Sequence, residues 1–277
     1  MLFLQQIRFK SIPFLALIAF MGLFSCSKFR KIQKSEDWRL KYEAGFKYYE
    51  KKDYYHSAIL FEEIRPIVRG LPEGEKVEFY LAYCQYYEKT YLLASNQFKT
   101  FYETYGRSSL AEEAQFMYAY SLFVSSPPPN LDQKESIESM DAMQNFLNQY
   151  ADSKYRDKAT EVITVSRKKL EQKGYENAKQ YLRLRSYKAA VISFDNFKKN
   201  FPDSQYLEEL AYLKVIAQYR FAIQSFKSLQ TDRYNLVVEY HKELIDNFPE
   251  SKYLKETEKL YADSLDKLNQ LKTTKQS

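Results

Sequence analysis

The chain has 277 residues, 45% of them hydrophobic and 28% charged, and a formal net charge of +6, which is typical of a globular protein of one or two domains. Only six glycines stand beside 26 tyrosines, and aromatic residues make up 17% of the chain. So few glycines argue against a turn-rich all-β fold and a glycine-lined phosphate loop, and the long charged periodic segments predict an all-α protein.

Residues 1–25 have the pattern of a secretory signal peptide. Arg8 and Lys10 precede an apolar run at 12–24, which is shorter than the roughly 20 residues that a membrane-spanning helix needs. We therefore predict that this segment is removed from the mature protein. Its removal lowers the net charge from +6 to +4, because two positive charges and no negative charge are lost.

The end of the apolar run, "LFSC" at 23–26, resembles a bacterial lipobox, although Phe24 is bulkier than the residue commonest there. This pattern predicts that Cys26 is the lipid attachment site, that it carries acyl chains such as palmitate, and that residues 26–37 form a lipidated tether. Because Ser27 replaces an aspartate, we expect a lipoprotein of the outer membrane that faces the periplasm, a compartment without nucleic acid. The alternative is an ordinary cysteine after a plain signal peptide.

An eight-residue phrase occurs twice, as "NFPDSQYL" at 200–207 and "NFPESKYL" at 247–254, with looser copies at 104–110 and 149–155. Proline ends a helix and disfavours the helical conformation of the residue before it. Ser204 and Ser251 are predicted at N-cap positions, where their hydroxyls accept a free backbone N–H. The phrase therefore marks the end of one helix and the start of the next.

The helix before each phrase carries an apolar stripe with spacings of three, four and three residues. The stripes are Tyr54, Ser57, Phe61, Ile64; Tyr91, Ala94, Phe98, Phe101; Ser136, Ser139, Met143, Phe146; Tyr187, Ala190, Phe194, Phe197; and Tyr234, Val237, His241, Leu244. An earlier helix of each unit has an aromatic residue followed three residues later by a small one, which permits close helix contact. These pairs are Tyr42 and Gly45, Phe79 and Ala82, Phe116 and Ala119, Tyr175 and Ala178, and Tyr219 and Ala222.

Two helices in a unit of about 34 residues resemble the tetratricopeptide (TPR) repeat. The resemblance implies a right-handed superhelical solenoid of about five TPR-like helix pairs, whose first helices line a concave surface. The expected segments are units 1 to 3 at 38–170, units 4 and 5 with a C-terminal capping helix at 171–272, and a tail at 273–277. A proline-rich loop at 125–133 is expected to interrupt the third unit.

The sequence predicts no enzyme, cofactor or metal site. It has no glycine-rich phosphate loop and no zinc-spaced Cys/His set, and its histidines are His56 and His241, the second of which lies in a stripe. Acidic pairs such as Glu62 and Glu63 are typical of solvated helix faces. Cys84 has no cysteine left to pair with once Cys26 carries lipid, so we expect a small core residue.

Aromatic residues recur at the groove-facing positions of the first helices of units 1 to 3. We predict a peptide-binding groove there, because rigid aromatic rings are good contacts for an extended peptide. The alternative is that these residues only pack against the neighbouring repeat. Units 4 and 5 carry Lys179, Leu182 and a basic run, "RLRSYK", and this asymmetry favours two different partners. The predicted groove residues are Tyr42, Phe46, Tyr49, Phe79, Tyr83, Tyr86, Phe116, Tyr120 and Phe123.

The chain as a whole resembles the BamD family of outer-membrane assembly lipoproteins, in particular members from Bacteroidetes. The features that carry this resemblance are the lipobox, the irregular TPR-like units, the chain length, the "NFPDSQY" turns and the loop "SPPPNLDQ". The resemblance implies a non-enzymatic scaffold. Its C-terminal units would bind the periplasmic domains of a BamA-type barrel insertase, and its N-terminal units the C-terminal segments of unfolded β-barrel precursors. The alternative is a periplasmic TPR adaptor for envelope or peptidoglycan machinery. A glycan-binding lipoprotein is less well supported, since Trp38 is the single tryptophan.

Overall fold

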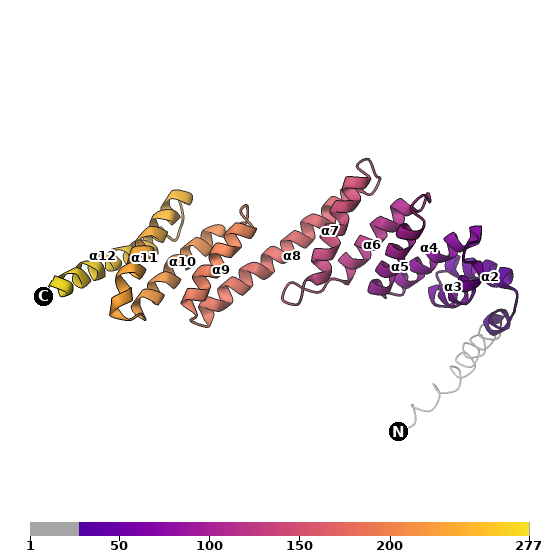
Figure 1. Cartoon of the computed structure of the whole chain (residues 1–277), viewed down its shortest axis with the longest axis horizontal. Helices are drawn as coiled ribbons and strands as arrows, with labels where there is room; N and C mark the ends of the chain where they lie inside the picture. Colours follow the sequence, from indigo (N-terminus) through magenta and orange to yellow (C-terminus); the bar gives the residue numbers. More distant parts are fainter. Residues whose placement is uncertain (1–27, 277) are drawn as a thin grey trace, which may run out of the picture. The chain divides into compact units, whose positions relative to one another are not determined.

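The computed structural model describes residues 28–276, and within that range its long regular elements are all α-helices (Figure 1). The predicted signal peptide and Cys26 lie outside the described residues. Residues 28–33 form a short helical segment. The long helices are α2 (Trp38–Glu50), α3 (Tyr54–Val68), α4 (Pro72–Tyr87), α5 (Tyr91–Thr104), α6 (Ala111–Ser125), α7 (Lys134–Gln149), α8 (Arg156–Arg183), α9 (Tyr187–Asn200), α10 (Leu207–Ile223), α11 (Lys227–Asn247) and α12 (Leu254–Gln276).

These helices form the five pairs that the repeat predicts, α2 with α3, α4 with α5, α6 with α7, α8 with α9 and α10 with α11. From α2 to α7 each helix packs against its neighbours in the chain. The last helix, α12, packs against both α10 and α11, as a capping helix does. The prediction of an all-α fold with TPR-like pairs and a capping helix is therefore confirmed. α12 extends to Gln276, through most of the segment expected as a tail.

The chain divides into two compact units, each of which contains more than one of the repeated helix pairs, and from here on unit 1 and unit 2 mean these two parts. Unit 1 comprises the described residues 28–127 and 133–166, and unit 2 comprises 128–132 and 167–276. The 28-residue helix α8 contributes to both, because Ala159 and Val162 are buried in a core of unit 1 whereas Ala178 is buried in unit 2. The third and fourth stripes are 51 residues apart because α8 is about twice as long as the other first helices.

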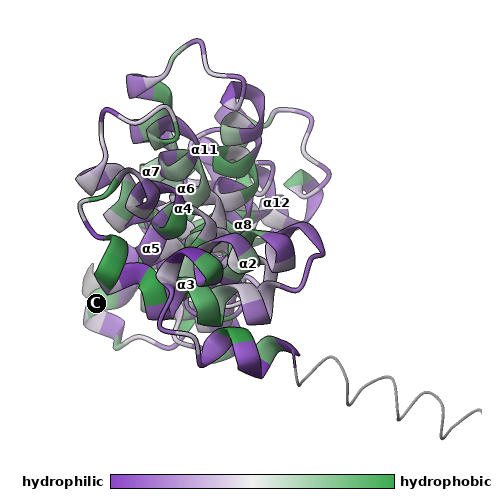
Figure 2. Cartoon of the chain, turned by 90° about the vertical axis from the view of Figure 1, so that its right-hand side faces the viewer, coloured by the Kyte–Doolittle hydropathy of each residue, from purple (hydrophilic) through white to green (hydrophobic). Residues whose placement is uncertain are grey.

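The predicted stripes form the cores of the two units. Phe61, Phe98 and Phe146 are fully buried, and small residues opposite them let the paired helix approach. At Gly45 an added Cβ would lie 2.5 Å from Cε1 of Phe61, so α2 and α3 pack too closely there for a larger residue. Figure 2 shows the matching pattern of amphipathic helices, since hydrophobic and hydrophilic residues occur side by side on the same helices.

The turn between the two helices of a pair repeats as well. Lys52, Lys89 and Arg185 have positive φ angles of 62°, 63° and 59°, and each lies two residues before the first stripe residue of the next helix. Backbone N–H groups of these turns bond to carbonyls of the preceding helix end, as in a Schellman motif. Glycine usually occupies this left-handed position, and these turns form without it, which accounts in part for the low glycine content.

The repeated phrase follows the second helix of a pair and contacts the first helix of the same pair. Its serine donates a hydrogen bond to a glutamate of that first helix, and in the last three copies the tyrosine two residues later stacks on an aromatic ring of the same helix. The serine bonds are Ser108 to Glu75, Ser153 to Glu112 (2.6 Å), Ser204 to Glu171 and Ser251 to Glu208 (2.7 Å). The stacked rings are Phe116 and Tyr155 (4.4 Å), Tyr175 and Tyr206 (4.0 Å), and Tyr212 and Tyr253 (4.3 Å).

The N-cap prediction for the phrase serines is correct in chemistry but not in position. Ser204 Oγ accepts the backbone N–H of Tyr206 at 3.1 Å, so the hydroxyl does satisfy a free donor. However, α10 begins only at Leu207 and its N-cap residue is Tyr206. The serine instead stabilises the turn before the helix, because it bonds both to the backbone N–H and to the distant glutamate.

Ser251→Ala is expected to lower the melting temperature by a few degrees. The change removes the bond to Glu208 and the one from Tyr253 N–H, together about 1 to 2 kcal/mol. Circular dichroism during heating measures it, with Ser228→Ala, an exposed serine of α11, as the matched control. Equal melting temperatures for the two variants would show that the repeated serine is dispensable for stability.

Candidate functional site

The nine predicted groove residues lie on α2, α4 and α6, the first helices of the three helix pairs of unit 1. The structure separates them into two groups. Phe79 and Phe116 are 3% and 5% exposed, so they belong to the core. The remaining seven are half-buried and retain some accessible surface. The packing alternative therefore describes Phe79 and Phe116, and the half-buried rings remain candidates for binding.

The half-buried rings contact one another in a nearly continuous row, and two tyrosines that the sequence did not single out, Tyr80 and Tyr87, connect them. The contacts between ring centroids are Tyr42–Phe46 (4.9 Å), Phe46–Tyr80 (5.0 Å), Tyr80–Tyr49 (4.9 Å), Tyr49–Tyr87 (6.3 Å), Tyr87–Tyr83 (5.9 Å), Tyr87–Tyr86 (5.6 Å), Tyr86–Tyr120 (6.3 Å) and Tyr120–Phe123 (5.9 Å). We call this set the aromatic row. The run "FYLAYCQYY" of α4 was the available signal for both connecting residues.

The phenol groups of the row differ in what they can offer to a ligand. Tyr83 donates its hydroxyl to Glu113, and its ring lies 5.0 Å from that of the buried Phe98. Burial, and then the bond to Glu113, raises the pKa of Tyr83. Burial also raises the pKa of Tyr49 and raises that of Tyr86 to about 12. All three phenols are thus neutral at physiological pH, but the Tyr83 hydroxyl is already used within the fold.

An open hollow of about 520 Å³ lies at the α2 end of the row. Tyr42, Phe46 and Tyr80 supply aromatic surface to it, and charged side chains of both signs surround them. The charged lining residues are Glu43, Lys47, Glu50 and Lys76. Aromatic surface beside a few polar groups is the usual composition of a site that holds an apolar side chain and satisfies the backbone next to it.

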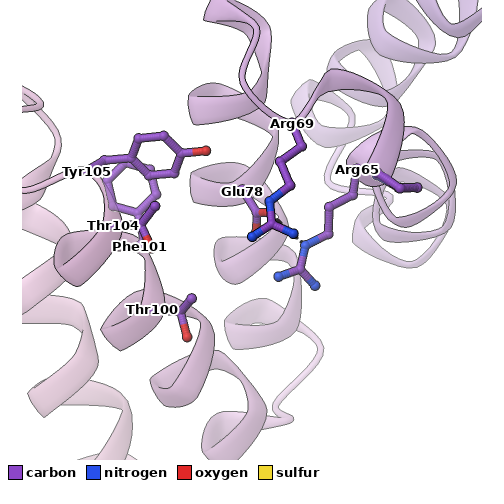
Figure 3. Close-up of a pocket in the computed structure, with 8 residues that line it drawn as sticks. Arg65, Arg69, Glu78, Thr100, Phe101, Thr104 and Tyr105 are labelled. Carbon is purple, nitrogen blue, oxygen red and sulfur yellow. Dashed lines mark hydrogen bonds and ion pairs between the residues drawn. The ribbon is translucent and has the colours of Figure 1, made fainter.

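A second hollow of unit 1 lies among α3, α4 and α5, and none of its residues was predicted as a site (Figure 3). It has a volume of about 270 Å³. Arg65 Nε donates to Glu78 Oε1 at 2.8 Å, and Arg69 lies beside this pair. Thr100, Phe101, Thr104 and Tyr105 line the α5 side. The available sequence signal was the spacing of four residues between the two arginines in "EEIRPIVRG".

Unit 2 has a different surface. Lys179, predicted to give it polar character, donates to Tyr175 Oη of its own helix at 2.6 Å and to Glu209 Oε1 of α10 at 2.8 Å, so its charge is already paired within the fold. The turn from α10 to α11 exposes three apolar side chains, Ile223, Phe226 and Leu229, and Phe226 is 83% exposed. Exposed apolar residues that gather at one place are typical of contacts with another protein.

The histidines and Cys84 are all held within the fold. His56 Nδ1 lies 2.8 Å from Asp53 Oδ1, and His241 is buried with Nδ1 3.1 Å from Thr257 Oγ1. Cys84 is fully buried, donates to Ser57 Oγ at 3.4 Å, and has its pKa raised to about 12 by burial. Within 28–276 no cluster of three such ligands could hold a metal ion, and no helix is long and apolar enough to cross a membrane.

The sequentially paired helices define a helical-repeat protein. The chain belongs to the YfiO family of outer membrane lipoproteins, since the model of that family matches residues 35–234. This confirms the predicted resemblance, and as a member of this family the chain is not an enzyme.

A protein of Aquifex aeolicus (strain VF5), described as a putative outer membrane protein assembly factor BamD, is 30% identical to this chain over 173 residues. The matched region covers 62% of this chain and 56% of the relative, so the chain spans little more than half the length of the curated relative that it matches.

Proposed function

We propose that this chain is a lipid-anchored scaffold of the outer membrane that faces the periplasm and helps to assemble β-barrel proteins. The observation that carries the proposal is the family match, which extends from residue 35 to 234 and so includes helices of both units. The name of the Aquifex aeolicus relative supports a role in assembly. Lipid on Cys26, with more than one acyl chain, would make the attachment to the membrane durable.

In this proposal unit 1 binds the C-terminal segments of unfolded barrel precursors. Such a segment is extended, alternates apolar and polar residues, and often ends in an aromatic residue with its carboxylate. The hollow at the α2 end of the aromatic row suits it, because Tyr42, Phe46 and Tyr80 offer rings while Lys47 and Lys76 offer positive charge for the carboxylate. Ordering a peptide costs conformational entropy, so we expect affinity of roughly micromolar strength.

Unit 2 binds the BamA-type insertase in the same proposal. The exposed side chains of Ile223, Phe226 and Leu229 support this assignment, because a Phe that is 83% exposed has no packing role in the isolated chain. The two binding roles are assigned to different units because unit 1 has an aromatic hollow, whereas unit 2 has a turn with exposed apolar side chains.

Tyr42→Ala combined with Lys76→Ala is expected to weaken binding of a barrel C-terminal peptide about tenfold or more, since each side chain contributes ~1 kcal/mol as a contact of the hollow. Both residues line the hollow and neither is buried, so the fold should be retained. Tyr83 is unsuitable, because it bonds to Glu113 and packs on Phe98. The measurement is fluorescence anisotropy of the labelled peptide against the full chain.

The matched control is Tyr55→Ala combined with Lys168→Ala, which removes the same two residue types from exposed positions away from the hollow. The control should bind like the unchanged protein. Equal affinity of the control and the hollow variant would show that the hollow is not the peptide site. If neither the unchanged protein nor any variant bound the peptide, the proposed precursor-binding role would be wrong.

A further inference from the structure

The residues directly after Cys26 form a short helix with two different faces. Residues 28–33 are helical, and Phe29 and Ile32 turn toward the body of unit 1 while the basic side chains remain exposed. In Figure 2 this helix adjoins the grey trace and carries both hydrophobic and hydrophilic residues. The sequence predicted a tether over 26–37, whereas the structure places most of that segment on the folded body.

Specific contacts hold the short helix on α2 and α3. Phe29 is only 7% exposed, and its ring centroid lies 4.2 Å from that of His56 and 5.6 Å from that of Tyr48. One turn later Gln33 Nε2 donates to Glu63 Oε1 at 2.8 Å. Because the contacts are spaced over the whole helix, it has a defined orientation relative to the start of α3.

The exposed face of the helix is strongly basic. It carries Lys28, Arg30, Lys31 and Lys34, and among the described residues no ion pair involves any of these four. Glu36 and Asp37 follow in the chain, but the Asp37 carboxylate accepts the Arg39 N–H at 2.9 Å and caps α2. The four cations are therefore available to an anionic partner.

The lipid attachment site lies very near this basic face. Lys28 lies two positions after Cys26 in the chain, which limits the distance between their Cα atoms to about 7 Å even for a fully extended backbone. Acyl chains on Cys26 would thus hold the helix at the level of the lipid headgroups. Basic residues at such a surface are attracted to anionic lipids, each strengthening binding several-fold at low ionic strength.

We propose that the exposed basic face of residues 28–34 binds the anionic phospholipid headgroups of the membrane surface, and that this contact orients unit 1 with the beginning of α3 toward the membrane. The inference rests on the lipid-anchored function proposed above, because the lipid on Cys26 brings the helix to the bilayer. It adds a second, electrostatic contact, which holds the body in one orientation rather than leaving it free to rotate.

The test uses the full chain, produced in a Gram-negative host, purified with its lipid and reconstituted into vesicles of phosphatidylcholine with or without phosphatidylglycerol. A fluorophore is attached at Tyr55→Cys or at Ile67→Cys, both exposed positions of α3 that are roughly 18 Å apart along the helix axis. Cys84 does not react, since it is fully buried. Nitroxide-bearing lipids then quench a fluorophore that lies near the headgroups.

With phosphatidylglycerol present we expect at least twofold stronger quenching at position 55 than at position 67. High salt, or replacement of Lys28, Arg30, Lys31 and Lys34 by glutamine, should abolish this difference. Glutamine at Lys255, Lys259, Lys267 and Lys272 of α12, an equal change in charge, should leave it intact. Equal quenching at both positions, or no effect of the basic-face variant, would overturn the proposal while leaving the assembly function standing. A wild-type protein without acyl groups at Cys26 would overturn it together with the lipid anchor.

Discussion

Replacing Ala190 by tryptophan is expected to lower the melting temperature of the protein by several degrees. Ala190 is fully buried in the core of unit 2, where it packs with Tyr175, Ala178 and Phe194 between α8 and α9. A large ring in a close helix contact forces side chains from their rotamers or moves the backbone, at a cost of about 1 to 3 kcal/mol. Circular dichroism at increasing temperature measures the loss directly.

The control for this variant is Asn196→Trp, an exposed position of the same helix α9. It introduces the same ring without entering the core and without a change of charge, so its melting temperature should stay near that of the unchanged protein. Were the two variants to melt together, the small residues of the repeat would not be the sites of close helix contact.

Cys26→Ser is expected to abolish stable attachment of the mature protein to the membrane. Attachment by buried acyl chains contributes about 0.8 kcal/mol per methylene, so more than one chain makes release negligible, whereas a serine cannot be lipidated on sulfur. The variant should appear in the periplasmic fraction, or as an uncleaved precursor that still carries residues 1–25. Fractionation of cells grown with labelled fatty acid, followed by mass determination of the N-terminal peptide, distinguishes these forms.

Two results would contradict the lipid anchor. One is a wild-type protein that incorporates no labelled fatty acid. The other is a serine variant that is cleaved normally and still remains in the membrane fraction. Either result would favour an ordinary cysteine after a plain signal peptide, and the membrane contact would then need another source.

The helix pairs could be predicted because their signals are local. The three, four and three spacing of Tyr91, Ala94, Phe98 and Phe101 identifies a buried helix face, and the structure buries Ala94, Phe98 and Phe101. The proline-centred phrases likewise mark the ends of α9 and α11. Such patterns depend on residues within one or two helical turns, which the sequence displays directly.

The length of α8 could not be predicted in the same way. The repeat favours a first helix near Tyr175, yet α8 begins at Arg156. No proline interrupts this stretch, and Gly174 is an isolated glycine, which a helix tolerates at a modest cost. The helix therefore continues where the repeat pattern suggests a boundary, because no residue of this stretch terminates it.

The partners of the repeated serines lie too far away in the chain for a local pattern to reveal them. Ser204 and Glu171 are 33 residues apart, and Ser251 and Glu208 are 43 apart. Only the packed helices bring them together. The contact between Phe29 and His56 could not be predicted either, since nothing in the basic segment around Phe29 indicates a buried ring.

The aromatic content of the candidate site could be predicted, but the role of each ring could not. Phe79 and Tyr42 occupy the same position of the repeat, yet Phe79 is buried whereas Tyr42 is half-buried and lines the hollow between α2 and α4. The outcome depends on how far each first helix is rotated against its neighbours. A rotation of a few tens of degrees exchanges a core position for a groove position, and the sequence spacing alone does not determine it.

Depletion of this protein, with quantitative mass spectrometry of the outer membrane, tests the proposed assembly role most directly. The amounts of β-barrel proteins as a class should fall before growth changes, while other outer-membrane lipoproteins, which need no barrel insertion, should remain constant and serve as the internal control. Unchanged barrel levels together with altered cell shape or division would contradict the assembly role and identify an adaptor of peptidoglycan machinery instead.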